Sequence, residues 1–303
     1  DVDMAAAVLL TTVSEASRLG VPRSSWVYIH GCADAVEVPV LLSERPELHR
    51  CKAIAAMGRE LSCAAGMPLD RCELVDIYSC FPVAVEVACR ELGLDIERRS
   101  GRELTVTGGL PFYGGAGNAY SMFSIVAMCE KLRAKPGAFG LLTANGGFLT
   151  KHSAAIYSTV PYSETHPEGT WRRTSPAELQ RGLDEEAGAL VVDDAPSGRG
   201  VVETCTVEHS REGPKRAIFI GRLLDGEAAG RRFLATSRDP AAMALVMKGE
   251  GCGAIGVVST EKERSTFTPE RTPAADLPEP AGRLRALRPL GTSASMCRAR
   301  SKL

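Results

Sequence analysis

Three stretches of the chain contain side chains that can do acid–base chemistry, and each adjoins a predicted turn. In the first, residues 75–82 (VDIYSCFP), Cys80 stands where a predicted strand passes into a predicted helix. The positive end of a helix dipole stabilises a thiolate, so a cysteine at this place is a candidate nucleophile or acid–base group. The alternative is a structural role, because most cysteines serve as small buried hydrophobic residues.

The second stretch, residues 108–122 (GGLPFYGGAGNAYSM), has five glycines in ten residues and leads into an apolar helical pattern. The dinucleotide fingerprint G-x-G-x-x-G does not fit, because Tyr120 takes the place of its third glycine, and the lysine of a Walker loop is absent. The pattern predicts a strand-to-helix turn whose backbone N–H groups can meet an anion or a carbonyl oxygen.

The third stretch, residues 143–153 (TANGGFLTKHS), follows another predicted strand. Asn145 can donate a side-chain hydrogen bond, and His152 can act as an acid–base group or bind a diphosphate. Alternatively, Asn145-Gly146 forms a type I′ hairpin turn, which would leave Lys151 and His152 as ordinary exposed residues.

The elements that position these residues form an alternating order. Hydrophobic periodicity predicts strands at 26–31, 74–79, 104–107, 139–143 and 154–159, and helices at 43–66, 81–92 and 118–133. Gly66 and Gly93 are expected to end the first two helices. The resulting βαβαβαββ order predicts an α/β domain with a covered mixed sheet.

A second domain is predicted after a connector at 160–196. Short strands at 201–209, 217–223, 232–236 and 254–259, with a helix at 239–248, indicate a small β-barrel or sandwich. We therefore expect a first domain at 1–195, a second at 196–272 and a flexible tail at 273–303.

Composition excludes several classes of function. Of the 303 residues, 44% are hydrophobic and 24% charged, and the formal net charge of −1 argues against a nucleic-acid partner. In the second domain only Phe219 and Phe233 are candidate stacking platforms for single strands. No apolar run has the length of a membrane span. The ten cysteines show neither C-x-x-C nor paired histidine spacing, so we expect reduced thiols and no metal site.

Taken together, the three stretches resemble the C-terminal half of a thiolase. The likeness rests on the element order, the strand–loop–helix at 78–81, the glycine loop at 108–117 and the Gly-Gly hairpin at 144–147. It also rests on the sequence segments VTGGLPFYGGAGNAYSM…GLLTANGGFLTKHSAAIYST. Over residues 1–270 the chain is most similar to sterol-carrier-protein-type thiolases and their divergent relatives, the acetyl-CoA acetyltransferase-like thiolase-like proteins of type 1. Those relatives carry an additional C-terminal domain with an OB-like β-fold.

The resemblance also shows which thiolase residues this chain lacks. The G-H-P motif falls on Gly114-Gly115-Ala116, so its histidine is replaced by Gly115, and the C-x-G motif falls on Ala144-Asn145-Gly146, so its cysteine is replaced by Ala144. The H-D-C-F loop of the sterol-carrier type reads Tyr78-Ser79-Cys80-Phe81, which retains the acid–base cysteine. The resemblance implies that Cys80 is catalytic, with His152 as a second candidate. The implied thioester pocket comprises Tyr78, Ser79, Gly114, Gly115, Asn145, Gly146 and Gly147.

Two functions are implied by this resemblance. The first is that of an acyl-CoA-handling enzyme, a divergent acetyl-CoA acyltransferase of lipid or sterol metabolism. The second is that of a catalytically inactive acyl-CoA-binding or scaffold protein on a thiolase fold. In both, a coenzyme A thioester is the substrate or ligand, and no cofactor is covalently bound.

Two further partners are expected. The nucleophile-bearing N-terminal thiolase half is absent from the sequence, so we expect it from the same gene product or from a second chain. The tripeptide Ser301-Lys302-Leu303 matches a peroxisomal address, which predicts recognition by a peroxisomal import receptor and location in peroxisomes or related microbodies.

Overall fold

The computed structural model describes residues 3–97, 101–113, 117–167, 169, 171 and 173–270. These residues divide into two compact units, one of residues 3–40 and 49–187 and the other of residues 41–48 and 188–270. Gly114, Gly115, the tail at 273–303 and Ser301-Lys302-Leu303 lie outside the described residues, so the interpretations placed on them stay predictions.

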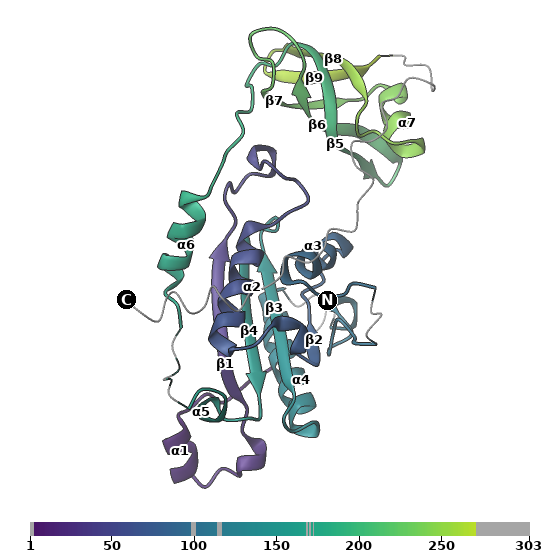
Figure 1. Ribbon diagram of the computed structural model, residues 1–303. Helices are drawn as coiled ribbons and strands as arrows, with labels where there is room; N and C mark the ends of the chain where they lie inside the picture. Colours follow the sequence, from purple (N-terminus) through teal and green to yellow (C-terminus); the bar gives the residue numbers. More distant parts are fainter. Residues whose placement is uncertain are drawn as a thin grey trace. The chain divides into compact units, whose positions relative to one another are not determined.

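The first unit is built on a four-stranded mixed sheet with the order β1-β4-β3-β2 (Figure 1). Its strands are β1 (Tyr28–Val36), β2 (Leu74–Asp76), β3 (Phe139–Gly146) and β4 (Lys151–Ser158). β2 pairs with β3 in parallel, and the β1–β4 and β3–β4 pairs are antiparallel. The predicted α/β class with a mixed sheet is confirmed.

Helices cover both faces of this sheet. The helices of the unit are α1 (Val13–Arg18), α2 (Lys52–Ala65), α3 (Pro82–Leu92), α4 (Tyr120–Ala134), α5 (Tyr162–Thr165) and α6 (Pro176–Glu185). Neighbouring strand residues point to opposite faces, so Leu141 packs in the cluster with α2 and α3 while Leu142 packs in the cluster with α4. As predicted, α2 and α3 end at Gly66 and Gly93, which take the left-handed conformation.

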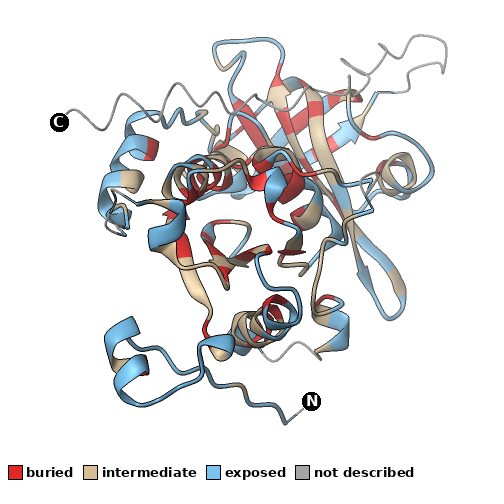
Figure 2. Ribbon diagram, turned by 60° about the horizontal axis from the view of Figure 1, so that its bottom comes forward, coloured by how far each residue is buried: buried red, intermediate tan, exposed pale blue. Residues whose placement is uncertain are grey.

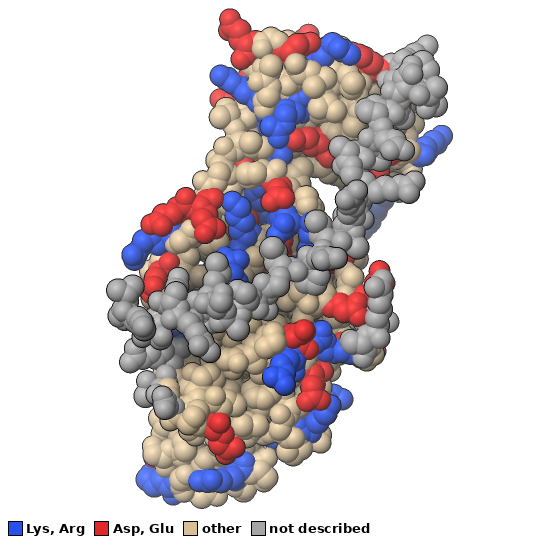
Figure 3. All heavy atoms as spheres, viewed as in Figure 1, with Lys and Arg blue, Asp and Glu red and all other residues tan. Residues whose placement is uncertain are grey.

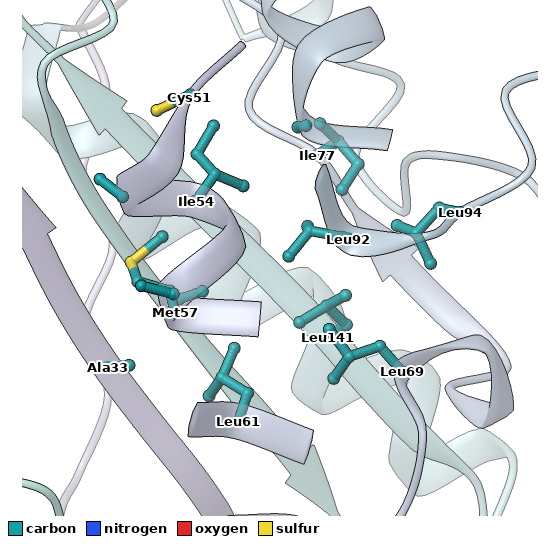
Figure 4. Packing of buried hydrophobic residues seen from close by; sticks show 14 of the residues in the cluster. Ala33, Cys51, Ile54, Met57, Leu61, Leu69, Ile77, Leu92, Leu94 and Leu141 are labelled. Atoms are coloured by element: carbon teal, nitrogen blue, oxygen red, sulfur yellow. The ribbon is translucent and has the colours of Figure 1, made fainter. Parts of the chain in front are cut away.

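The larger core lies between α2, α3 and the sheet. Buried residues concentrate in the sheet and on the facing sides of its helices (Figure 2). The close view shows Ile54, Met57 and Leu61 of α2 beside Leu92 of α3 and Leu141 of β3 (Figure 4). Burial of such apolar side chains is the main source of stability, at about 1.5 to 3 kcal/mol for each large one.

The prediction of a strand at 104–107 is wrong. Its backbone runs past the end of β2, where the Ile77 N–H donates to the Leu104 carbonyl at 2.9 Å, and it forms no strand. The buried carboxylate of Asp76 accepts the N–H groups of Val106 and Thr107 at 2.9 and 3.3 Å. A side chain therefore satisfies donors that a neighbouring strand would satisfy, and the segment stays a loop.

The type I′ turn considered for Asn145-Gly146 is also wrong. Both residues lie in β3, and they pair with His152 and Lys151 of β4. The connection is formed by residues 147–150, with positive φ angles at Gly147 and Leu149. Because β4 begins at Lys151 rather than at 154, His152 is a strand residue and is only 4% exposed.

One edge of the sheet is partly closed by a side chain. Within the described residues β1 is an edge strand, and Gln180 of α6 accepts the Val36 N–H at 2.8 Å and donates to the Val36 carbonyl at 3.0 Å. The primary amide thus makes the pair of hydrogen bonds that a neighbouring strand would make at this residue.

The second unit is a closed five-stranded barrel with the order β5-β6-β7-β9-β8 (Figure 1). Its elements are β5 (Gly198–Ser210), β6 (Gly213–Leu223), β7 (Arg232–Ser237), α7 (Pro240–Lys248), β8 (Ile255–Glu261) and β9 (Arg264–Pro269). The predicted small OB-like barrel is confirmed, although β9 was not among the predicted strands. Phe219 and Phe233 are completely buried in the barrel core with Phe267, so neither offers a ring face to a base.

A buried arginine joins the segment 41–48 to this barrel. Arg232 of β7 is 1% exposed and donates to the Ser43 and Arg45 carbonyls at 2.9 and 2.6 Å, and to the Glu203 carboxylate at 2.6 Å. Burial alone would raise the pKa of Glu203, but hydrogen bonds from Arg232 and Arg222 outweigh it and the pKa is lowered.

The surface carries charges of both signs. On the face shown in Figure 3, acidic and basic side chains are interspersed rather than gathered into a field of one sign. None of the helices in the described part of the chain has the length and apolar character that a bilayer crossing requires.

Candidate functional site

Cys80 lies in the short loop between β2 and α3. The loop is fixed to the neighbouring strand because the Tyr78 N–H donates to the Thr143 hydroxyl at 3.0 Å. The Cys80 thiol is half-buried and donates to the side-chain oxygen of Asn145, with 3.6 Å between Sγ and Oδ1. The structure thus brings together Cys80 and Asn145, which the sequence analysis placed in two separate loops.

Tyr78 borders the same loop. Its ring meets the ring of Tyr120 edge to face, with 5.3 Å between their centres. Burial, and secondarily the nearby Cys80 thiol, raises the pKa of Tyr78. The phenol therefore stays protonated at neutral pH and keeps an O–H that can donate a hydrogen bond.

The glycine loop is held against Cys80's loop by Asp76 and Ser79. One oxygen of Asp76 accepts hydrogen bonds from the hydroxyls of Thr105 and Thr107 at 2.7 and 3.0 Å, besides the two backbone N–H groups already described. The Ser79 hydroxyl accepts the Leu110 N–H at 3.3 Å. Gly109 has φ +89°, and a Cβ there would lie 2.9 Å from Ser79 Oγ. A glycine is required because the loop backbone passes so close to the Ser79 hydroxyl.

His152 stands opposite Asn145 on the neighbouring strand. The two residues form a register pair of β3 and β4, so their side chains lie on the same face of the sheet. The imidazole Nε2 is 3.3 Å from Sγ of Cys51, and this thiol donates to the Glu37 carboxylate at 3.0 Å. Cys51 and Glu37 are 1% and 3% exposed. His152 is therefore one end of a buried polar cluster.

A cavity of about 550 Å³ opens beside these residues, at the end of β3 and the start of β4. It is lined by Asp34, Ala35, Val36, Ala144, Asn145, Gly146, Lys151, His152, Ser153, Pro176, Ala177 and Gln180. Cys80 is not among the lining residues, and Asn145 both lines the cavity and contacts Cys80. A ligand in this cavity would meet the imidazole and the amide directly, and the thiol through the amide.

Three loops of the site each present an exposed aromatic ring. Phe81, Phe112 and Phe148 are 68%, 78% and 91% exposed, and they follow Cys80, the glycine pair at 108–109 and Gly147. Large aromatic side chains left in water are unfavourable, and an exposed group of them indicates a surface that binds something. The three loops that carry the polar residues of the site therefore also carry exposed aromatic rings.

Four residues of this site were missed by the sequence analysis. Asp76, Thr143, Cys51 and Glu37 position the predicted residues. Asp76 had one usable signal, because an acidic residue inside the apolar strand-like run LVDIY is expected to be buried with partners. Cys51 and Glu37 lie more than a hundred residues before His152, and no spacing in the sequence relates them to it. Among the described residues, no group of three or more His, Cys, Asp or Glu side chains is arranged to hold a metal ion.

The fold and the site define a thiolase-like α/β unit followed by a small barrel. The family model for the thiolase-like protein type 1 additional C-terminal domain matches residues 178–263. The crystal structure of a monomeric SCP2-thiolase-like protein type 1 from Mycobacterium smegmatis is 37% identical, with a TM-score of 0.73 over 84% of this chain. The chain belongs to the thiolase-like family with the additional C-terminal domain.

The similar structures are longer than this chain and are matched only in part. The chain spans only 53% of the Mycobacterium smegmatis protein. The peroxisomal 3-ketoacyl-CoA thiolase of Saccharomyces cerevisiae is 17% identical over 48% of this chain and 37% of that protein, with a TM-score of 0.34, and no inference rests on it. A search of the curated proteins finds no match.

Proposed function

We propose that the chain handles acyl-CoA thioesters as a divergent thiolase-type acyltransferase of lipid metabolism. The observation that carries the proposal is the row Cys80–Asn145–His152, in which the thiol contacts the amide, and the amide and the imidazole lie on one face of the sheet and line one cavity. A thiol moves a proton on and off the carbon next to a thioester, an imidazole can accept and return protons, and an amide N–H stabilises the charge that develops on the thioester oxygen.

In this proposal each residue has one role. Cys80 accepts and returns the α-proton of an acyl group that extends from the cavity past Asn145 to the thiol, whose sulfur lies 3.6 Å from Oδ1 of Asn145. The Tyr78 phenol, the Asn145 amide and the glycine loop supply the donors that the replaced motif residues supply in ordinary thiolases, and His152 is a proton acceptor beside them. Retention of the acid–base cysteine together with a buried imidazole favours turnover over a purely structural role.

The second candidate function is acyl-CoA binding without turnover. Gly115 and Ala144 stand where the motif histidine and cysteine would be, and this observation favours loss of the condensation chemistry. Both functions place the acyl-CoA in the same cavity, and they differ in whether the ligand exchanges its α-protons.

The deciding experiment measures binding and proton exchange separately. Acetyl-CoA is titrated into the 303-residue chain by calorimetry, and its deuterium uptake in D₂O is followed by mass spectrometry. The acyltransferase proposal expects binding and uptake, with uptake lost in Cys80→Ala and retained in Cys252→Ala, a matched change at an exposed cysteine of the barrel. Binding without uptake in the wild type supports the second function, and absence of binding contradicts both.

We also propose that the exposed ring surface of Phe81, Phe112 and Phe148 is covered by an N-terminal thiolase half. The segments that carry the three rings are tied to one another by the Cys80–Asn145 and Ser79–Leu110 contacts, so a single partner can cover all of them. A chain extended by the missing half should protect these loops from hydrogen exchange. Equal exchange with and without that half would contradict the proposal.

A further inference from the structure

The cluster behind His152 has no role in the proton transfer assigned to Cys80. Glu37, at the end of β1, and Cys51, at the start of α2, are both buried, and they approach His152 of β4 from the core side. Figure 4 shows Cys51 at the start of α2, next to Ile54. A carboxylate, a thiol and an imidazole in one buried row are costly to desolvate, so their arrangement requires an explanation.

Hydrogen-bond capacity assigns the protons in this row. The Glu37 carboxylate has only acceptors when ionised, and its Oε2 also takes the Ala53 N–H at 2.7 Å. The single proton of the Cys51 thiol therefore goes to Glu37, at 3.0 Å. The sulfur is then an acceptor, and the group 3.3 Å away that can donate to it is Nε2–H of His152. In the neutral imidazole this leaves the acceptor lone pair on Nδ1.

We propose that Glu37 and Cys51 are positioning residues that hold His152 in one orientation and one tautomer at the wall of the cavity. The row resembles a nucleophile–base–carboxylate triad in one respect. A buried carboxylate orients an imidazole from the side away from the ligand, and here it does so through a thiol. Cys51 itself is 1% exposed and does not meet the ligand. This inference rests on the proposed function only in naming an acyl-CoA thioester as the ligand that meets His152.

The other polar side chains around the cavity have partners of their own or are exposed, and none of their described contacts is with His152. Asp34 pairs with Arg173 and accepts from the Ser153 hydroxyl at 2.6 Å. Gln180 bonds to Val36 and Asp184. Lys151 lines the cavity next to His152 and is exposed. Among the described contacts, the imidazole meets the core side of the sheet through Cys51.

The test is the ring N–H proton of His152, observed by NMR in the ¹⁵N-labelled chain and assigned with His152→Gln. In the wild type we expect a slowly exchanging proton on Nε2. In Cys51→Ala its exchange should be at least about fivefold faster, because a net hydrogen bond contributes about 1 kcal/mol and every 1.4 kcal/mol is about tenfold. Cys51→Ser keeps a hydroxyl that can bridge the two groups and should restore slow exchange.

The matched control is Cys89→Ala, which removes another thiol of the same core that is also 1% exposed, and it should leave the resonance unchanged. Equal exchange rates in the wild type and in a folded Cys51→Ala variant would overturn the positioning role, as would a wild-type proton on Nδ1. Added acetyl-CoA should shift the His152 resonance. If the variants behave as expected but acetyl-CoA causes no shift, the positioning role stands and the ligand assignment fails.

Discussion

Replacing Asp76 by alanine tests whether one carboxylate holds the glycine loop beside Cys80. The side chain is completely buried and accepts two backbone N–H groups and two hydroxyls through Oδ1. The hydroxyls of Thr105 and Thr107 are 2.9 Å apart and can bond to each other, and the Thr107 N–H also donates to Thr105 Oγ1 at 3.1 Å, so the Val106 N–H is the donor that depends on Asp76. At about 1 to 3 kcal/mol for an unsatisfied donor, the free energy of unfolding should fall by about 1 to 3 kcal/mol.

The assay is urea unfolding followed by tryptophan fluorescence. Both tryptophans, Trp26 and Trp171, belong to the first unit, so the signal reports on the unit that contains Asp76. Asp76→Asn keeps an acceptor oxygen and should lose less than Asp76→Ala. Asp70→Asn, a matched change at an exposed residue, should alter the free energy by less than about 0.5 kcal/mol. An Asp76→Ala protein as stable as the wild type would refute the reasoning.

Three further predictions concern the loop, the barrel and pH. Gly109→Ala should destabilise the first unit more than Gly101→Ala in urea unfolding. Both glycines have positive φ, but only a Cβ at 109 would meet a neighbour, Ser79 Oγ at 2.9 Å. Equal losses of stability would mean that this contact is unimportant. Arg232→Ala should cost the barrel about 2 to 6 kcal/mol, because two carbonyls lose their donor and Glu203 keeps only Arg222 as a partner. Arg231→Ala, at an exposed residue, should cost under about 1 kcal/mol. Hydrogen exchange of β5 to β7 measures both losses, and similar values would count against the role of the buried arginine. Burial lowers the pKa of His30 below its ordinary value of 6.5, so the unfolded chain takes up a proton at a higher pH than the folded chain. The free energy of unfolding should therefore decline as pH falls below about 6.5. This decline should be smaller in His30→Gln, and identical pH profiles of the variant and the wild type would contradict the prediction.

Periodicity was enough to predict most of the fold. Strands and helices with apolar residues on one or two faces, such as β3, α2 and α3, were predicted because burial selects those residues directly. Gly66 and Gly93 marked helix ends because left-handed backbone favours glycine. The barrel was recognisable from alternation, but β9 (RSTFTP) contains only one large apolar residue, Phe267, and gave no periodic signal.

The predictions that failed did so because distant side chains replaced local signals. Residues 104–107 have strand-forming composition, yet Asp76 takes their donors and keeps them in a loop. Asn-Gly favours a hairpin turn locally, but pairing with β4 extends β3 through Gly146. The sequence identified Cys80, Asn145 and His152 one by one, but it did not show that Cys80 contacts Asn145 or that Asn145 pairs with His152, because pairing across a sheet depends on register.

The amide of Gln180 on the Val36 backbone has a consequence for how copies of the protein behave at high concentration. An open strand edge invites another chain to add itself, which is the first step of edge-to-edge aggregation. At Val36 both backbone groups of β1 are already bonded, so an incoming strand could not keep a continuous ladder past this residue without expelling α6's side chain. One glutamine thus serves as a strand terminator, contributed by a helix rather than by a proline or a charged residue in the strand itself.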